Sequence, residues 1–251
     1  MITITPIAAF SDNYIWVLHQ DGRAVAVDPG AAAPLQDFLT AHTLHLDAIL
    51  VTHHHADHIG GVAELVRPDL PVYGPPNVAE VTHALHDGDT VSLPQFALTL
   101  SVLAVPGHTL DHLAYTGQDM LFCGDTLFAC GCGRLFEGSP QQMLTSLTRL
   151  SALPASTRIY CAHEYTLANQ RFARRVEPDN LALQQRHVRD QARRAQQRPT
   201  LPSTLAEEHD SNPFLRVHCA TVRQAVAHHD GMPYLDDVDT FARLRAWKNA
   251  N

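Results

Sequence analysis

Four histidines and one aspartate lie within the seven residues from Thr52 to His58, directly after the apolar run 48–51. That run is short, uncharged and rich in branched aliphatic side chains, so it predicts a buried strand. The cluster then follows a strand end, and strand ends form the edge at which open α/β sheets build their sites. His53 and His55 are two residues apart, so both side chains point to the same side of an extended chain. Imidazole and carboxylate groups together predict a site for zinc, iron or manganese.

The spacing His53-x-His55-x-Asp57-His58 resembles the metal-binding signature of the metallo-β-lactamase superfamily. A polar loop with chance histidines is the alternative, because the chain holds 17 histidines. Any one of these residues fits that alternative, but the complete pattern after a strand is specific. The last two begin a predicted helix over residues 57–67.

Three more apolar segments lead to a residue that can bind a metal. They are residues 98–105 with His108, residues 119–123 with Asp125, and residues 158–161 with His163. Alone, His108 fits a core histidine and Asp125 fits a turn residue. Taken with the cluster, the three bring the ligand set to seven, the number that two ions need if they share one carboxylate.

The seven ligands divide into two sets of three and one shared residue. Each set leaves room for a common water, as a catalytic site requires. Asp57 is also expected to orient this shared water, which would act as a hydroxide. The sets are His53, His55 and His108 for one ion and Asp57, His58 and His163 for the other, with Asp125 as the bridge.

Composition restricts the partners and the compartment of the chain. A net charge of −8 over 251 residues argues against binding nucleic acid with the whole surface. We see neither a run of about 20 apolar residues, as a membrane span needs, nor a signal peptide at the N-terminus. Five cysteines, an odd number, show no secreted disulfide framework. We therefore expect a cytoplasmic monomer with reduced thiols and with no membrane or nucleic-acid partner.

The pattern of apolar and polar residues changes after Tyr165. Residues 1–165 alternate strand and helix patterns, and we assign them to a metal-binding domain. Residues 166–251 are expected to be helical without strands of their own, and we assign them to a substrate-binding domain. The predicted helices are 166–176, 180–197, 219–229 and 237–248, with a loop-like connector over residues 203–217.

Nearly the whole chain resembles glyoxalase II, the hydroxyacylglutathione hydrolase family. The resemblance implies an α/β fold, a four-layer αβ/βα metallo-β-lactamase sandwich with a dinuclear site at one edge and a C-terminal helical domain. The motifs that carry it are Thr52 to Gly61, Pro106 to Thr109, Gly124 to Phe128, Gly131 to Gly138, Cys161 to Thr166 and Asn212 to Val217.

The family resemblance implies a reaction and a set of substrate contacts. The reaction is hydrolysis of S-2-hydroxyacylglutathione thioesters by a metal-bridging hydroxide, as in the second step of methylglyoxal detoxification, where S-D-lactoylglutathione gives glutathione and D-lactate. Two divalent ions are the implied cofactors, zinc first, with iron or manganese as alternatives. Some members have lysine and tyrosine where this chain has Arg134 and Phe136. The implied contacts are Arg134, Phe136, Tyr165, Arg245 and Lys248.

Lys248 is the only lysine in the chain, and it falls at the family's position. It lies three residues after Arg245, so the two share one face of a helix. A solvated helix face is the alternative for any such charged pair. The position of the single lysine favours a pocket for a substrate carboxylate.

Other functions stay open at this level. A persulfide dioxygenase of the same superfamily would keep the histidine motif but bind one iron, and a β-lactamase would carry a secretion signal. A metal-dependent RNA-processing nuclease is suggested by eight arginines between Arg171 and Arg198, although exposed helix faces are the usual place for such residues. A non-catalytic binding module would hold metal and ligand without turnover.

Overall fold

The computed structural model describes residues 1–231 and 236–250. The chain forms two compact units that alternate along the sequence. Unit 1 consists of Met1–Val105, Asp111–Gly124 and Tyr160–His163, and unit 2 consists of Pro106–Leu110, Asp125–Ile159 and the chain from Glu164 onward. None of the described helices is both long enough and apolar enough to cross a membrane.

The first sheet of unit 1 has its strands in chain order, from β1 to β6. The first three strands are antiparallel, and the pairings from β3 to β6 are parallel. The strands are β1 (Thr3–Ala9), β2 (Asn13–Gln20), β3 (Arg23–Val27), β4 (His45–Leu50), β5 (Val72–Gly74) and β6 (His83–Ala84).

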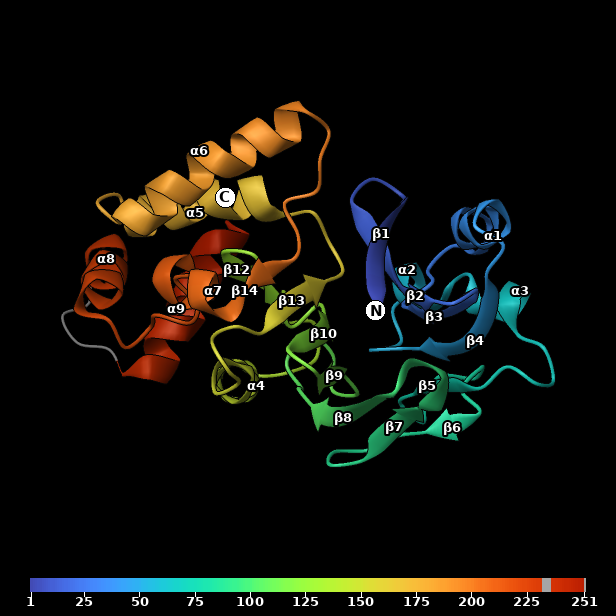
Figure 1. Ribbon diagram of the computed structural model, residues 1–251. Coiled ribbons are helices and arrows are strands. Elements are labelled where there is room, and N and C mark those ends of the chain that lie inside the picture. The colour runs from blue at the N-terminus through green and yellow to red at the C-terminus, as the bar shows by residue number, and fades with distance from the viewer. Residues whose placement is uncertain (232–235, 251) are drawn as a thin grey trace. The chain divides into compact units, whose positions relative to one another are not determined.

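Helices cover one face of this sheet, which is why its central strands are almost wholly apolar. Helix α1 (Ala32–Ala41) and the short helix α3 (Val62–Leu65) lie beside each other next to the sheet (Figure 1). Leu35 and Val62 from these helices join Val17 and Ile49 from the strands in one apolar cluster.

The second sheet contains the remaining strands of unit 1 in the order β13-β10-β9-β8-β7. The interior between the two sheets is closed by buried aromatic residues. Trp16 donates its indole N–H to the Cys161 carbonyl (2.9 Å), and Tyr115 donates its hydroxyl to the Val51 carbonyl (2.6 Å). The strands are β7 (Thr90–Leu93), β8 (Leu98–Ala104), β9 (Leu113–Gly117), β10 (Met120–Gly124) and β13 (Arg158–Cys161), with the 3-10 turn η1 (Pro94–Phe96) between β7 and β8.

Unit 2 is mainly helical. A two-stranded hairpin, β11 (Leu127–Phe128) and β12 (Gly131–Cys132), lies among the helices. The helix at 140 begins as its sequence predicts, since Ser139 caps it and Pro140 occupies its first position. The helices are α4 (Pro140–Ser151), α5 (Thr166–Val176), α6 (Leu181–Ala195), α7 (Leu205–Ser211), α8 (Ala220–Asp230) and α9 (Asp237–Asn249).

The predicted helix 57–67 is wrong. The structure has two four-residue helices instead, α2 (Ala56–Ile59) and α3, separated by Gly60 and Gly61. A Cβ on Gly61 would lie 2.4 Å from the Ala32 backbone nitrogen, and one on Gly60 would lie 2.7 Å from the Gly30 carbonyl oxygen. The two glycines therefore admit the backbone of the 29–32 segment, which interrupts the helix.

The predicted loop over residues 203–217, and the expectation that no strand follows residue 166, are also wrong. A short strand, β14 (Ser203–Thr204), pairs with Arg158 and Ile159, and α7 follows directly. Thr204 and Glu207 form a reciprocal capping box at the start of α7. That Thr-x-x-Glu spacing was the available signal for this helix.

Candidate metal centre

The Asp28 carboxylate fixes the backbone at the point where β4 ends. Its Oδ1 atom accepts the Thr52 backbone N–H and its Oδ2 atom accepts the Thr52 hydroxyl, both at 2.7 Å. In the second sheet, burial raises the pKa of Tyr115 on β9 well above its usual value, and the charge of Asp28 adds to this effect. The Tyr115 hydroxyl therefore stays a hydrogen-bond donor to the Val51 carbonyl. The start of the histidine cluster is held by buried hydrogen bonds before any ligand binds.

Carboxylates orient two of the predicted ligand imidazoles in unit 1. His58 Nδ1 lies 3.0 Å from Asp28 Oδ2, and His163 Nδ1 lies 2.8 Å from Asp12 Oδ1. A carboxylate only accepts hydrogen bonds, so each Nδ1 atom carries the proton and each Nε2 atom presents its lone pair. Metal-binding histidines are commonly oriented by such carboxylate partners.

Asp57, His58 and His163 come together in unit 1. Asp57 Oδ2 lies 3.4 Å from His163 Nε2 and 3.6 Å from His58 Nε2, and it accepts a hydrogen bond of 2.9 Å from the Asn13 amide. A tetrahedral ion with bonds of about 2.1 Å holds neighbouring ligand atoms about 3.4 Å apart. The donor types and spacing of this triad fit one metal ion.

His53 and His55 also lie together in unit 1, with ring centroids 4.7 Å apart. His53 Nδ1 lies 3.0 Å from the Thr52 hydroxyl. The buried His112 ring stacks on His53 at 4.5 Å and 16°, so it packs against a predicted ligand. His54 contacts Asp111 instead (3.0 Å), as the alternation of an extended chain predicts.

The two remaining predicted ligands, His108 and Asp125, belong to unit 2. His108 Nε2 lies 3.4 Å from Asp125 Oδ2, and His108 Nδ1 lies 2.8 Å from the Arg134 carbonyl oxygen. A Cβ on Gly133 would lie 1.9 Å from the Asp125 carbonyl oxygen, so only glycine allows this approach.

Arg245 and Lys248 lie on the same side of α9, beside the buried Phe214 ring. Their charged groups lie 5.2 and 5.7 Å from the ring centroid. Arg245 is 6% exposed and donates to the Cys132 carbonyl (2.9 Å), whereas its Nε atom has no hydrogen-bond partner within the described chain. Burial, and next the charge of Arg245, lower the pKa of Lys248 to about 8. The pair is therefore not a solvated helix face.

The other predicted substrate contacts also lie in unit 2. Tyr165 precedes α5 and its ring packs edge-on against Phe128 (5.3 Å). Arg134 is exposed, and Phe136 is 61% exposed with its ring 5.2 Å from that of His108. The backbone of Arg134 thus supports a predicted metal ligand while its side chain faces solvent.

The sequence analysis missed the supporting side chains. Asp12, Asn13 and Asp28 belong to no predicted motif, although each contacts a predicted ligand. Asn169, whose amide contacts Lys248, had no signal at all in the sequence.

Comparison with known proteins covers almost the full chain. The model of the hydroxyacylglutathione hydrolase C-terminus matches residues 164–251, and the metallo-β-lactamase superfamily model matches residues 9–69 and 66–163. The predicted fold class is confirmed.

Individual relatives support the same family assignment. Hydroxyacylglutathione hydrolase of Nitrosomonas eutropha is 51% identical over 252 residues, which are 99% of each chain. The protein of that name from Cupriavidus taiwanensis is 52% identical over 264 residues, again 99% of each chain. Among solved structures, TTHA1623 in a di-iron-bound form has a TM-score of 0.53 and 28% identity, covering 64% of this chain and 91% of its own. The chain belongs to the hydroxyacylglutathione hydrolase family of the metallo-β-lactamase superfamily.

Proposed function

We propose that the protein hydrolyses S-2-hydroxyacylglutathione thioesters, including S-D-lactoylglutathione, to glutathione and a 2-hydroxy acid. The proposal rests on the sequence identity of 51% and 52%, over 99% of this chain, to relatives named hydroxyacylglutathione hydrolase. The buried cationic pair on α9 and the metal-type donors of unit 1 support it from the structure.

We assign the seven predicted ligands to two divalent ions, zinc first, with iron or manganese as alternatives. Support comes from the ligand-like spacing of the Asp57, His58 and His163 donors and of the His108–Asp125 pair. The related TTHA1623 protein has been solved with two irons, which supports a dinuclear centre. Bound divalent ions supply Lewis acidity and hydroxide at neutral pH.

The chain's own residues then have distinct tasks in the reaction. Asp57, held by the Asn13 amide, orients the attacking oxygen through Oδ2. Asp12 and Asp28 hold their histidines in the tautomer that presents Nε2. The leaving thiolate has a conjugate acid of pKa about 8.5, so the reaction needs no strong general acid from the protein.

The glutathione part of the substrate, called here the glutathione arm, is assigned to unit 2. Arg245 and Lys248 would bind a carboxylate of glutathione, with Arg134, Phe136 and Tyr165 as further contacts. The buried Nε–H of Arg245 supports this, because a carboxylate would supply the partner that this donor lacks in the described chain. We retain residues 1–165 and 166–251 as the metal-binding and substrate-binding domains, and the cytoplasmic monomer as a prediction.

A thioester assay beside elemental analysis tests the proposed function. Purified protein is expected to contain two divalent ions per chain and to hydrolyse S-D-lactoylglutathione. Chelation should abolish turnover, and zinc, iron or manganese should restore it, because the hydroxide forms only with metal. One iron per chain with oxygen consumption would support the dioxygenase instead, and RNA cleavage without thioester hydrolysis would support the nuclease.

The double variant Arg245→Ala/Lys248→Ala is expected to raise KM about 100-fold and to change kcat by less than about threefold. Each lost charge-assisted hydrogen bond costs about 1.5–3 kcal/mol, and both act on the bound arm rather than on the reacting carbonyl. Arg243→Ala is the matched control, because Arg243 lies on the same helix and its acidic partner among the described residues, Asp230, is 3.9 Å away. An unchanged KM in the double variant would refute the carboxylate pocket.

A further inference from the structure

Side chains of the helices hold the backbone of the β11–β12 hairpin along its length. Five consecutive residues each use one backbone group in such a bond. The bonds are Phe128 O with Asn212 Nδ2 (3.1 Å), Ala129 O with Asn169 Nδ2 (2.9 Å), Cys130 N with Glu208 Oε2 (2.7 Å), Gly131 O with Asn212 Nδ2 (3.0 Å) and Cys132 O with Arg245 Nη1 (2.9 Å). The hairpin that leads from Asp125 to Arg134 is therefore held in place by buried polar groups.

Among the described residues, Asn169 is the one of these side chains that also forms a hydrogen bond with Lys248. Its Nδ2 atom donates to the Ala129 carbonyl, and its Oδ1 atom accepts a hydrogen bond from the Lys248 ammonium. The two partners fix the orientation of the amide, since only its oxygen can accept and only its nitrogen can donate. Asn169 is 2% exposed, so water cannot replace either partner freely.

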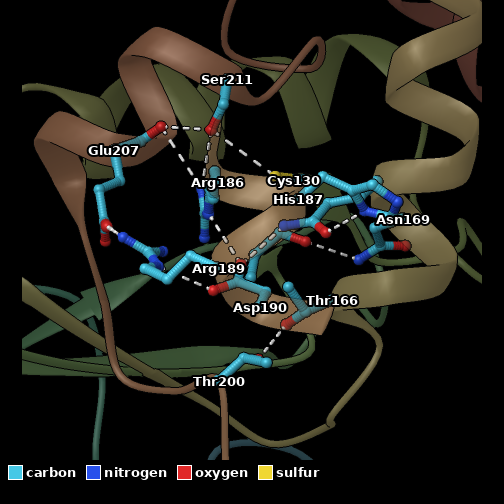
Figure 2. Close-up of polar contacts among 12 residues, drawn as sticks. Cys130, Thr166, Asn169, Arg186, His187, Arg189, Asp190, Thr200, Glu207 and Ser211 are labelled. Atoms are coloured by element: carbon cyan, nitrogen blue, oxygen red, sulfur yellow. Dashed lines mark hydrogen bonds and ion pairs between the residues drawn. The ribbon is translucent and has the colours of Figure 1, made fainter. Parts of the chain in front are cut away.

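The surroundings of Asn169 leave it little freedom. A Cβ on Gly131 would lie 2.5 Å from the Asn169 amide nitrogen, so that glycine admits the side chain. Helix α5 is itself anchored on both sides of Asn169. The Thr200 hydroxyl donates to the Thr166 hydroxyl (2.6 Å; Figure 2), and the Gln170 amide donates to Asp190 (2.7 Å).

Lys248 needs such an anchor for two reasons. Its flexible four-carbon stem loses rotamer entropy when the amine is held in one place. The amine is also disfavoured as a cation, since burial and then Arg245 lower its pKa to about 8 while the Cys132 and Cys130 thiols raise it only partly. An acceptor that meets the ammonium counters both effects.

We propose that Asn169 is a positioning residue for the glutathione arm, fixing the Lys248 amine beside Arg245 and linking it to the β11–β12 hairpin. The role rests on the proposed thioester hydrolysis. Its described side-chain partners are Ala129 and Lys248 and include no predicted metal ligand, so Asn169 acts through Lys248.

Lys248 is the only lysine, so protein labelled with ¹³C-lysine gives one lysine side-chain signal in NMR. Titration of that signal measures the amine directly, without any assay of turnover. Asn169→Leu is expected to shift the titration midpoint down by about 0.5 pH unit or more, because the charged form loses its acceptor. Asn169→Asp should shift it up by about 1 unit, because it adds an opposite charge. Equal midpoints in all three proteins would overturn the proposal.

Steady-state kinetics distinguish a loss of Lys248 positioning from a general structural effect of the substitution. Asn169→Leu should raise KM for S-D-lactoylglutathione about 10-fold with kcat within about twofold, and kcat/KM of the wild type should fall above pH 8 as the amine loses its proton. In a Lys248→Met background the same substitution should change KM by less than about twofold. An equal rise in both backgrounds would mean that Asn169 acts through Ala129 alone, and would refute the role.

Asn180→Ala is the control for lost stability. Asn180 caps α6 through the Leu183 N–H, so removing its side chain lowers the stability of the protein. It has no described contact with Lys248, so the lysine midpoint and KM should stay at their wild-type values. If wild-type protein turns over no glutathione thioester, the proposed function fails, and the role in binding the glutathione arm fails with it. If turnover is normal and the lysine midpoint is insensitive to residue 169, only the positioning role fails.

Discussion

Replacing Asp125 with alanine is expected to lower the metal content from two ions per chain to one or none, and kcat by about 1,000-fold or more. The proposed bridge is shared by both ions, so its loss removes one ligand from each. Substitutions of side chains that merely support metal ligands cost about 10–100-fold, and loss of a bridging ligand should exceed that range. The structure supports a ligand role in unit 2, where Asp125 Oδ2 lies 3.4 Å from His108 Nε2.

Asp37→Ala is the matched control, since Asp37 is an exposed aspartate on α1. Metal content by elemental analysis and kcat for S-D-lactoylglutathione should match the wild type in this control. A second test is Asp28→Asn, which keeps the size of a side chain that orients His58. Its effect should be smaller than that of Asp125→Ala, within the 10–100-fold range of supporting residues. Full metal content and activity in Asp125→Ala would refute the bridging role.

The predicted ligands were visible in the sequence because their signal is local. His53 to His58 follow β4 within a few residues, and Asp125 directly follows β10. An apolar run that ends in a polar cluster can be recognised from neighbours along the chain alone. The fold class followed from the family motifs, through the resemblance that they carry.

The supporting residues were not visible because their partners lie far away in sequence. Asp28 contacts residues 24 and 30 positions later, and Asp12 contacts His163 across 151 positions. Asn169 and Lys248 are 79 positions apart. Nothing in the local pattern distinguishes such a residue from an ordinary turn or helix residue, so only the tertiary structure identifies it.

The arginines of α5, α6 and the following loop show the same limit. All eight from Arg171 to Arg198 fitted exposed helix faces, but this interpretation is wrong for Arg186, which is only 5% exposed. Arg186 donates to Glu208 (2.7 Å) and to the Ser211 hydroxyl (2.8 Å), and Figure 2 shows it between Ser211 and Asp190. Burial alone would lower the pKa of Arg186, but the Glu208 carboxylate outweighs it and the pKa is raised.

Arg186→Met is therefore expected to destabilise the protein by about 3–5 kcal/mol, the cost of leaving a buried charge without its partner. Glu208 is fully buried, and its Oε1 atom would lose the guanidinium that now neutralises it. Glu208 also accepts the Cys130 N–H of the β11–β12 hairpin. The loss of stability should therefore also affect this hairpin, which lies beside the proposed glutathione contact Arg245. Urea unfolding followed by circular dichroism measures the change in midpoint and slope.

Arg189→Met provides the matched control on the same helix. Arg189 also has two carboxylate partners, Asp190 (3.0 Å) and Glu207 (2.5 Å), but its side chain is 45% exposed. Exposed ion pairs contribute about 0–1 kcal/mol, so this variant should lose less than about 1 kcal/mol. Two variants with the same change in composition and different burial thus separate the effect of charge burial from the effect of charge count.

The pH dependence identifies the cause of the Arg186→Met effect. In the folded variant a buried carboxylate without its cation is relieved by taking up a proton, which the exposed carboxylate of the unfolded chain does only at lower pH, so the loss of stability declines as the pH falls. The destabilisation should therefore be largest near pH 8 and should shrink as the pH falls towards 5. A cavity left by a shortened side chain would cost the same at both pH values. A loss that does not depend on pH would show that Arg186 contributes through packing, and the role of its charge in holding Glu208 would then be refuted.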